Sequence, residues 1–358
     1  MFFCGAVGKV TKEREKMKTS ISTIILILLM LMITNLAKTQ QADLLKQAEK
    51  YFGPLPDTMI SKQNPITPEK VKLGKMLFYD TRISVDKTVG CFKCHWINLY
   101  ATDGLPKAIG NNYRINPRNS PTVLNAAGQI SEHWLGNRKS VEDQAKYSLL
   151  GKGSYGLTSF EEAEEKLNAI EGYYDLFQKA FPQDQHPVNV ENFALAIGAW
   201  ERTLVTPSRF DEFMKGKSSA LDEREKGALA LFMDTGCIKC HHSAFIGGKS
   251  YKKFGITQPY WELTGSKEID EGRYVVTNDR ADKYVFKVPM LRNVEMTSPY
   301  FHDGSVAQLP DAVKIMAQLQ LGKKLSDDQA RDIVIFLKSI TGTIPDDALQ
   351  IPILPPTQ

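Results

Sequence analysis

Two copies of one short cysteine pattern constrain this chain more than any other feature of its sequence. Residues 91–95 and residues 237–241 both read Cys-x-x-Cys-His. The chain has five cysteines, and the fifth, Cys4, precedes an apolar segment near the N-terminus. Every cysteine beyond that segment therefore belongs to one of the two copies, and the fold must present two such turns.

The spacing within each copy suits covalent attachment of haem. Two cysteines three positions apart, on an opening helical turn, can each form a thioether to one vinyl group of haem. The histidine that follows is then held over the iron as the proximal ligand. We therefore predict two covalently bound haem c groups, attached through Cys91, Cys94 and His95 and through Cys237, Cys240 and His241.

Other uses of a Cys-x-x-Cys pair explain less of the pattern. One zinc ion could take all four cysteines, but the two halves of the chain would then share it, and both histidines would have no role. A redox pair of the thioredoxin type belongs in a βαβ pattern, which this sequence lacks. A disulfide framework is a further use of four cysteines in an exported chain, and it also leaves the histidines unexplained.

Residues 1–40 differ from the rest of the chain and are typical of an export signal. A short basic segment begins at Met17, and residues 24–33 are apolar without interruption. This run is shorter than the ~20 residues of a membrane-spanning helix. We expect a periplasmic protein, anchored to the membrane if the signal is not cleaved.

Charge beyond the presequence is balanced. The formal net charge of the whole chain is +4, and the presequence accounts for it. Because no basic excess is left in the body of the protein, we expect no nucleic-acid partner.

The surroundings of the two motifs repeat. A helical run leads into each motif, over residues 68–77 and 222–231, and an amphipathic helix closes each half. The apolar positions of the closing helices are Phe193, Ile197, Trp200 and Leu204 in the first half, and Ile333, Phe336, Leu337 and Ile340 in the second. This repetition predicts a mainly α fold with two cytochrome c-like domains in tandem and little β structure. The predicted parts are a presequence (1–40), an N-terminal domain (41–206), a C-terminal domain (207–342) and a tail (343–358).

Three smaller expectations follow from local sequence. Residues 274–276 and 284–288 are rich in β-forming residues and lie between turn residues, so we expect them to pair. Ser326 has the character of an N-cap for the last long helix. The proline-rich residues 345–358 show no core pattern of their own.

Further segments, in order along the chain, resemble the bacterial diheme cytochrome c peroxidase family, which includes diheme enzymes that oxidise a partner protein. The resemblance covers about residues 64–355. Its most specific segments are 117–125 (Pro-Arg-Asn-Ser-Pro-Thr-Val-Leu-Asn), 291–294 (Leu-Arg-Asn-Val), 298–304 (Ser-Pro-Tyr-Phe-His-Asp-Gly) and 311–316 (Asp-Ala-Val-Lys-Ile-Met). It implies two unequal haems: the N-terminal one is the peroxide site, and the C-terminal one takes electrons from a small donor, a cytochrome c or a cupredoxin.

The resemblance also implies roles for single residues. Met316 matches the sixth ligand of the second haem, and Trp134 matches the tryptophan between the haems. His95, Trp134 and Gln144 form the implied catalytic set. The implied ligands of a calcium ion between the domains are Asn119, Thr297 and Pro299.

Each of these residues also has an ordinary structural explanation. A methionine in a helical apolar stripe is usually core filling, and one tryptophan of four is often simply a large buried side chain. Asn-Ser-Pro and Thr-Ser-Pro are turn formers in any protein.

Two positions depart from the family pattern. Asn111 occupies the place of a distal histidine, and Ser154 or Tyr155 replaces a glutamate beside the peroxide. His133 replaces an aromatic residue, and is either a core or surface histidine or a substitute distal base.

The resemblance and these departures give three hypotheses for function. The first is a peroxidase that reduces hydrogen peroxide to water, and the family implies a homodimer. The second is a peroxide-dependent oxidase of a protein or organic substrate. The third is a two-haem electron carrier without peroxide turnover.

Overall fold

The computed structural model describes residues 43–357. The chain divides into two compact units, residues 1–50 and residues 51–358. Of the first unit, residues 43–50 are described, and they are helical up to Ala48. The predicted presequence and Cys4 lie outside the described residues. None of the helices in the described part is long and apolar enough to cross a membrane.

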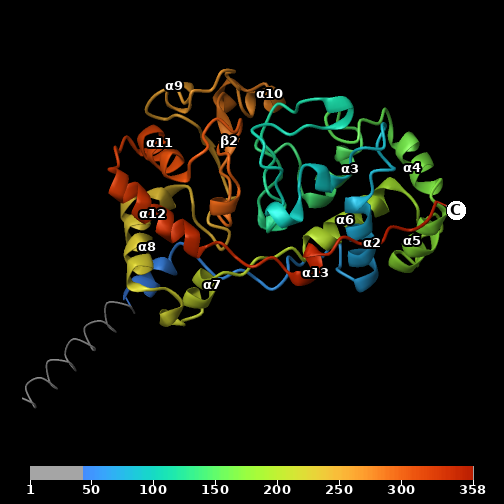
Figure 1. The fold of residues 1–358 in the computed structure, drawn as a ribbon, viewed down its shortest axis with the longest axis horizontal. Coiled ribbons are helices and arrows are strands. Elements are labelled where there is room, and N and C mark those ends of the chain that lie inside the picture. The colour runs from blue at the N-terminus through green and yellow to red at the C-terminus, as the bar shows by residue number, and fades with distance from the viewer. Residues whose placement is uncertain (1–42, 358) are drawn as a thin grey trace, which may run out of the picture. The chain divides into compact units, whose positions relative to one another are not determined.

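The regular secondary structure of the second unit is almost wholly helical, and long irregular segments connect the helices (Figure 1). Its α-helices are α2 (Pro68–Tyr79), α3 (Val141–Ser148), α4 (Phe160–Asn168), α5 (Tyr174–Ala180), α6 (Val190–Glu201), α7 (Arg209–Met214), α8 (Glu223–Thr235), α9 (Trp261–Thr264), α10 (Tyr274–Thr277), α11 (Leu309–Leu321), α12 (Asp327–Ser339) and α13 (Asp346–Leu349). The described strands, β1 (Tyr251–Lys253) and β2 (Val285–Lys287), form one antiparallel pair with Tyr251 opposite Lys287. The predicted fold class, mainly α with little β structure, is confirmed.

Helix α2 packs on α6 at the centre of the half that holds the first motif. Gly74 makes this crossing possible, because a Cβ at this position would lie 1.9 Å from the carbonyl oxygen of Ala196 in α6. Leu77, Phe193 and Ile197 are fully buried where the two helices meet. The predicted helix before the first motif and the predicted closing helix therefore form one core.

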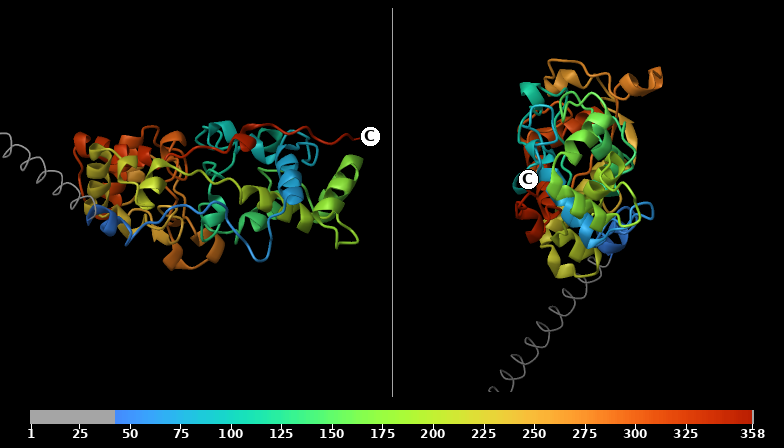
Figure 2. Two further views of the ribbon diagram at one scale, coloured as in Figure 1. Left: turned by 90° about the horizontal axis from the view of Figure 1, so that it is seen from below. Right: turned by 90° about the vertical axis from the view of Figure 1, so that its right-hand side faces the viewer.

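Helices α8 and α12 make the equivalent core in the half that holds the second motif. The rings of Phe232 and Phe336 lie 4.9 Å apart between them. Asp222 and Ser326 cap the two helices with reciprocal capping boxes, which confirms the N-cap expected at Ser326. Figures 1 and 2 show α8, α11 and α12 gathered in one half, and α2, α4, α5 and α6 in the other.

The expected pairing of residues 274–276 with 284–288 is wrong. Residues Tyr274–Thr277 form the single-turn helix α10, which Asn278 ends in the left-handed conformation. Strand β2 pairs with β1 instead. Preference for β structure depends on a neighbouring strand and on burial, and Val275 and Val276 are exposed at this site.

The proline-rich tail has more contacts than its sequence indicates. Ile344 and Ala348 are buried in a hydrophobic cluster with Trp200 of α6. Arg82 donates to the carbonyl oxygen of Pro355 at 2.9 Å, so the C-terminal segment runs back along the half that holds α2. The domain boundaries predicted from the sequence stay predictions.

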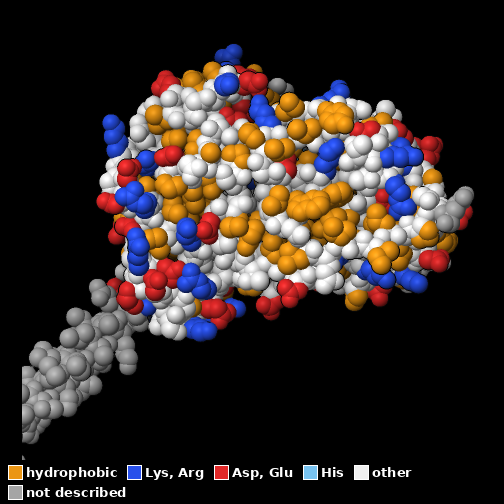
Figure 3. Space-filling view, in the orientation of Figure 1, with side chains coloured by type: hydrophobic (Ala, Val, Ile, Leu, Met, Phe, Trp, Pro, Cys, Tyr) orange, Lys and Arg blue, Asp and Glu red, His pale blue; other side chains and the backbone are white. Residues whose placement is uncertain are grey.

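Positive and negative side chains are interspersed over the face shown in Figure 3. This agrees with the balanced charge expected for the chain beyond its presequence.

Candidate functional site

Each cysteine pair lies on a short 3-10 turn directly after a helix or loop. In the first, Cys91–Lys93, the backbone N–H groups of Cys94 and His95 both donate to the carbonyl of Cys91, at 3.2 and 3.1 Å. The second, Cys237–Lys239, has the same closure, with His241 N–H 2.9 Å from the carbonyl of Cys237. The predicted opening helical turn is therefore present at both motifs.

None of the four cysteines of the described region forms a disulfide. Burial raises the pKa of both Cys91 and Cys237 to about 12. Burial also raises the pKa of Cys240, and the nearby charges of Lys252 and Lys239 oppose this effect. A reactive cysteine needs a thiolate, which these buried surroundings disfavour.

No single metal site unites the cysteine pairs. Within residues 43–357, no group of three or more His, Cys, Asp or Glu side chains is placed to hold one ion. The zinc site that would need all four cysteines is therefore not formed in this part of the chain.

Both motif histidines are neutral. Burial lowers the pKa of His95 and of His241 to about 4. His95 Nδ1 lies 3.3 Å from the carbonyl oxygen of Ala101, whereas buried His241 Nδ1 has no hydrogen-bond partner among the described residues. A neutral imidazole with a free ring nitrogen is the form that binds iron.

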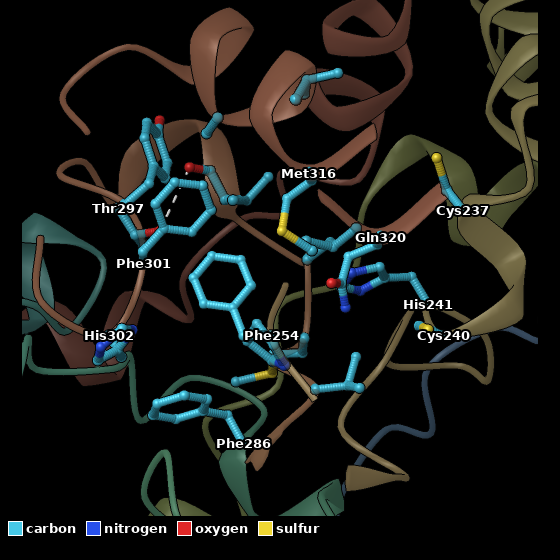
Figure 4. A pocket seen from close by; sticks show the side chains of 18 of the residues that line it. Cys237, Cys240, His241, Phe254, Phe286, Thr297, Phe301, His302, Met316 and Gln320 are labelled. Atoms are coloured by element: carbon cyan, nitrogen blue, oxygen red, sulfur yellow. Dashed lines mark hydrogen bonds between the residues drawn. The ribbon is translucent and has the colours of Figure 1, made fainter. Parts of the chain in front are cut away.

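A cavity of about 240 Å³ lies against the second motif. Cys237, Cys240 and His241 line it on one side, and Met316 of α11 lines it as well. Figure 4 shows the Met316 sulfur and the His241 ring both directed into the cavity. Two cysteine sulfurs, a neutral imidazole and a thioether around one largely apolar cavity fit a haem group with two axial ligands.

Helix α11 explains how Met316 reaches this cavity. Val313, Met316 and Gln320 are spaced by three and four residues, so they share one helix face, and all three line the cavity. The structure thus brings together Met316 and His241, as predicted from the resemblance.

Trp134 and the three predicted calcium ligands line the same cavity. The Trp134 indole N–H donates to the carbonyl oxygen of Asn119 at 2.9 Å. The Asn119 side-chain amide donates to the carbonyl oxygen of Leu105, which leaves its Oδ1 without a hydrogen-bond partner in the described region. An amide oxygen without a hydrogen-bond partner, in a cavity that Thr297 and Pro299 also line, is the type of ligand that a hard cation such as calcium prefers.

Gln144 lies apart from this group. It is half-buried on α3 and does not line the cavity at the second motif. Its side chain makes no hydrogen bond within residues 43–357. The structure therefore does not join Gln144 to Trp134 through a direct contact.

The two positions that depart from the family pattern lie side by side. Asn111 is 3% exposed, and its amide donates to the backbone carbonyls of Lys152 and Ser154 at 2.9 and 2.6 Å. Tyr155 is fully buried, with its hydroxyl 3.5 Å from Cys91 Sγ. The segment that replaces the glutamate therefore contacts the first attachment turn.

His133 faces the cavity of the second motif. It lines that cavity beside Trp134, and its Nδ1 lies 3.0 Å from Asn137 Oδ1. Burial lowers its pKa to about 4. Its backbone has a φ of 65°, the left-handed region, which directs the chain into the turn that holds Trp134.

Sequence reasoning gave little weight to His302, which the structure makes prominent. This histidine is buried, its Nε2 has no hydrogen-bond partner among the described residues, and it lines the same cavity. Its ring packs between Phe286 at 4.4 Å and Trp134 at 6.4 Å. Its membership of the 298–304 segment was the signal that pointed to it.

The structure buries three ionisable side chains for which the sequence makes no prediction. Glu132, Glu201 and Lys287 are each less than 10% exposed. Lys287 Nζ donates to Gln129 Oε1 at 2.8 Å, and Gln129 in turn donates to Glu132. Burial is the largest influence on Glu201, and it raises the pKa of that carboxyl well above its ordinary range. No motif or periodicity marks these residues in the sequence.

Comparison with known proteins agrees with the geometry of the site. Residues 68–219 match the family model for di-haem cytochrome c peroxidase. The chain is 40% identical to the cytochrome c551 peroxidase of Pseudomonas aeruginosa over 93% of its own length and 96% of that protein. It is 39% identical to the cytochrome c551 peroxidase of Nitrosomonas europaea, over 82% of this chain and 86% of that one.

A solved structure with the same fold is that of a MauG-like protein associated with microbial copper homeostasis. Its TM-score is 0.71 at 25% sequence identity, and the match covers 83% of this chain and 97% of that protein. Together with two attachment turns and the cavity beside Met316, these similarities place the chain in a family of two-haem proteins. The chain belongs to the di-haem cytochrome c peroxidase family.

Proposed function

We propose that this protein reduces hydrogen peroxide to water with electrons from a small redox protein, a cytochrome c or a cupredoxin. The net reaction joins one peroxide molecule, two electrons and two protons to give two water molecules. The observation that carries the proposal is 40% identity to a cytochrome c551 peroxidase over almost the whole chain, in a structure that keeps both attachment turns.

The residues at the two motifs account for how haem is held. Cys91 and Cys94 attach the first group as thioethers, with His95 as the iron ligand. Cys237 and Cys240 attach the second. Bound haem supplies the one-electron redox chemistry that the reaction needs.

His241 and Met316 distinguish the second site from the first. Their side chains face one cavity, so both would hold the iron of a haem group bound there. A thioether ligand favours the reduced state of iron, so the second site is the one that accepts electrons from the donor.

Three further predicted residues, Trp134, Gln144 and His95, would orient groups at the two haem sites. Trp134 is fixed by its bond to Asn119 and is the candidate for the side chain between the two sites. Gln144 has an amide without a hydrogen-bond partner in residues 43–357, and it can donate to a peroxide oxygen at the first site. Burial around His95 keeps its imidazole neutral for iron ligation.

Calcium at Asn119, Thr297 and Pro299 is part of the same proposal. The supporting observations are that Asn119 Oδ1 has no hydrogen-bond partner in the described region and that all three residues line one cavity. Elemental analysis of the purified protein is expected to give one calcium per chain, and Asn119→Ala is expected to lose it. Equal calcium content in the two proteins would remove Asn119 from the site.

A peroxide-dependent oxidase is the second candidate, and one observation favours it. The position of the family's glutamate is taken by Ser154 and Tyr155, so the usual acid–base group for peroxide cleavage is absent there. A protein that consumes peroxide only while a protein or organic substrate is oxidised would support this candidate. A protein that exchanges electrons with the donor but never consumes peroxide would be an electron carrier.

We further propose that the protein is exported to the periplasm and acts as a homodimer. The apolar run at 24–33 supports export. Cell fractionation and native mass measurement test the two statements separately.

The deciding experiment uses purified holoprotein. Haem staining on a denaturing gel, together with haem quantification, is expected to show two covalent haems per chain. The double variant Cys237→Ala/Cys240→Ala is expected to retain one haem, at the first motif. Half-reduced protein is mixed with peroxide and reduced donor protein in a stopped-flow instrument. We expect it to consume the peroxide and to oxidise the donor. One haem per chain, or no peroxide consumption at all, would contradict the proposal.

A further inference from the structure

The second motif lies in a part of the chain that has basic but no acidic residues. Residues 235–261 and 312–326 contain no Asp or Glu, although the chain has 41 acidic residues among 358. We call six of the lysines in these two segments the basic rim: Lys239, Lys249, Lys252, Lys253, Lys323 and Lys324.

Tertiary structure brings the two segments together at one place. Gln320 Nε2 at the end of α11 donates to the carbonyl oxygen of Lys253 at 2.9 Å, and Gln320 Oε1 accepts from the N–H of Gly255. Lys323 Nζ donates to the carbonyl oxygen of Thr235 at 2.8 Å, just before the second motif begins. The two lysine-bearing segments are therefore adjacent in the fold, although they are far apart in the sequence.

This surface borders the cavity of the second motif. Lys252, Gln320 and Leu321 line the cavity together with Cys237 and Cys240. All six rim lysines are exposed, and none of them forms an ion pair with another residue of the region 43–357. Lys323 Nζ is bonded to the carbonyl of Thr235 and Lys249 Nζ lies 5.1 Å from the Phe245 ring centroid, whereas the ammonium groups of the other four have no hydrogen-bond or ion-pair partner within residues 43–357.

The surroundings of the first motif are different. Lys93 lies there with the acidic residues Asp86 and Asp103, and Asp86 accepts hydrogen bonds from Thr88 and Asn112. Both signs of charge are thus present at the first motif, whereas at the second the six exposed lysines outnumber the acidic residues, of which Asp234 lies three residues before Cys237. A surface with an excess of one sign attracts partners of the opposite sign and accelerates their association.

We propose that the basic rim is the docking surface for the electron donor, and that the donor is a small redox protein with an acidic face around its redox centre. This inference rests on the proposed function, because it names the partner of the electron-accepting site. The position of the rim at the cavity places an acidic partner next to the motif that receives electrons. A basic cytochrome would be repelled by the same surface.

The charge reversal Lys253→Glu/Lys324→Glu tests the rim without touching the cavity, since neither residue lines it. The matched control is Lys72→Glu/Lys179→Glu. Both control lysines are exposed, lie on α2 and α5 in the other half of the chain, and form no ion pair within the described residues. The two variants carry the same total charge, so a difference between them reports position.

Three reductants are mixed with oxidised holoprotein over a series of ionic strengths: an acidic cupredoxin, a basic cytochrome c, and hydroquinone. For the wild type, the second-order rate constant with the acidic protein is expected to fall roughly tenfold or more as salt is raised. For the rim variant, the rate constant with the acidic protein at low salt is expected to be about tenfold lower than for the wild type. Its rate constant with the basic protein is expected to be higher than that of the wild type. The rate constants of the control variant are expected to stay within about twofold of those of the wild type. The wild type, the rim variant and the control variant are expected to react with hydroquinone at the same rate.

Binding affinity for the acidic protein is measured separately. It is expected to be similar for the wild type and the control variant and lower for the rim variant. Equal rate constants for the rim and control variants, or no salt dependence in the wild type, would overturn the proposal. Loss of binding to anionic phosphatidylglycerol vesicles, with donor rates unchanged, would also overturn it and make the rim a lipid surface.

The two levels of the proposal fail in distinguishable ways. If hydroquinone supports peroxide turnover but the acidic protein never reduces the holoprotein, the docking inference fails and the proposed function stands. If the acidic protein reduces it with the expected salt dependence but peroxide is never consumed, the docking inference stands and the proposed function fails.

Discussion

The side-chain amide of Asn111 donates a hydrogen bond of 2.6 Å to the backbone carbonyl of Ser154. This bond joins the two positions at which the chain departs from its family's pattern. Asn111 is buried, and its amide also donates to the carbonyl of Lys152. Its side chain therefore holds the 151–156 segment in place, and the nitrogen is not available as an iron ligand.

The first prediction concerns the resting state of the first haem. With Asn111 committed to the backbone, the fully oxidised protein is expected to show one high-spin haem and to react with peroxide without prior reduction. Asn111→His is expected to make this haem low-spin and to slow the reaction of the oxidised form. Electron paramagnetic resonance and stopped-flow mixing measure the two effects.

Asn111→Ala is the matched control for that experiment. It is expected to keep the high-spin haem while it loses about 1–3 kcal/mol of stability, because the carbonyls of Lys152 and Ser154 lose a buried donor. Two low-spin haems in the wild type, unreactive until half-reduced, would show that another residue, such as His133, closes the site.

Ser154 is the better position for restoring a carboxylate at the first site. Tyr155 is fully buried against Cys91, so a glutamate there would place a charge in an apolar environment, whereas Ser154 is half-buried. Ser154→Glu is expected to raise peroxide turnover, by as much as roughly 10²-fold, because a positioned acid–base group contributes about that much. Ser154→Gln has nearly the same size without the carboxylate and is expected to give no increase. Equal rates for the two variants would remove proton transfer at position 154 as the limiting step.

Met316→Ala is expected to remove the thioether charge-transfer band and to lower the reduction potential of the second haem. Val313→Ala changes a residue on the same face of α11 that lines the same cavity, and it is expected to keep both properties. Visible spectra and a redox titration compare the variants. A Met316→Ala protein with an unchanged band and potential would make this methionine a core residue only.

The buried pair Asp211 and Arg292 is expected to control stability in acid. Arg292 donates to both carboxylate oxygens of Asp211 at 2.8 Å, and both side chains are almost wholly buried. Burial alone would raise the pKa of Asp211, but the charge and hydrogen bonds of Arg292 outweigh it and lower that pKa below its ordinary value. The pair therefore stabilises the folded state above about pH 4, and this contribution is lost as pH falls through the lowered pKa.

Urea unfolding, followed by circular dichroism, measures this effect. Asp211→Asn is expected to lower the free energy of unfolding at pH 7 by about 3–5 kcal/mol, because it leaves a buried guanidinium without its partner. The same variant is expected to show less dependence on pH below 4 than the wild type. Asp328→Asn, which removes an exposed ion pair with Arg331, is expected to cost about 0–1 kcal/mol. A similar loss for both variants would contradict the assignment.

Local sequence predicted several elements because their causes lie within a few residues. The turns at Cys91 and Cys237 close within their own five residues, and Ser326 caps α12 through a partner three positions ahead. Periodic apolar residues were enough to predict the closing helices. Residues 274–276 show the limit of such reasoning, because their β preference had no neighbouring strand to satisfy it.

The sequence by itself determined that the chain is mainly helical, that it repeats one arrangement around two attachment motifs, and that its charge is balanced beyond residue 40. Tertiary structure alone decided that Asn111 bonds the segment at Ser154, that buried His302 lines the same cavity as Met316, and that the segments of Lys253 and Lys323 meet. The reason is physical: thioether spacing and helix periodicity act within one or two turns of chain. Hydrogen bonds and charge fields depend on which distant segments packing brings together.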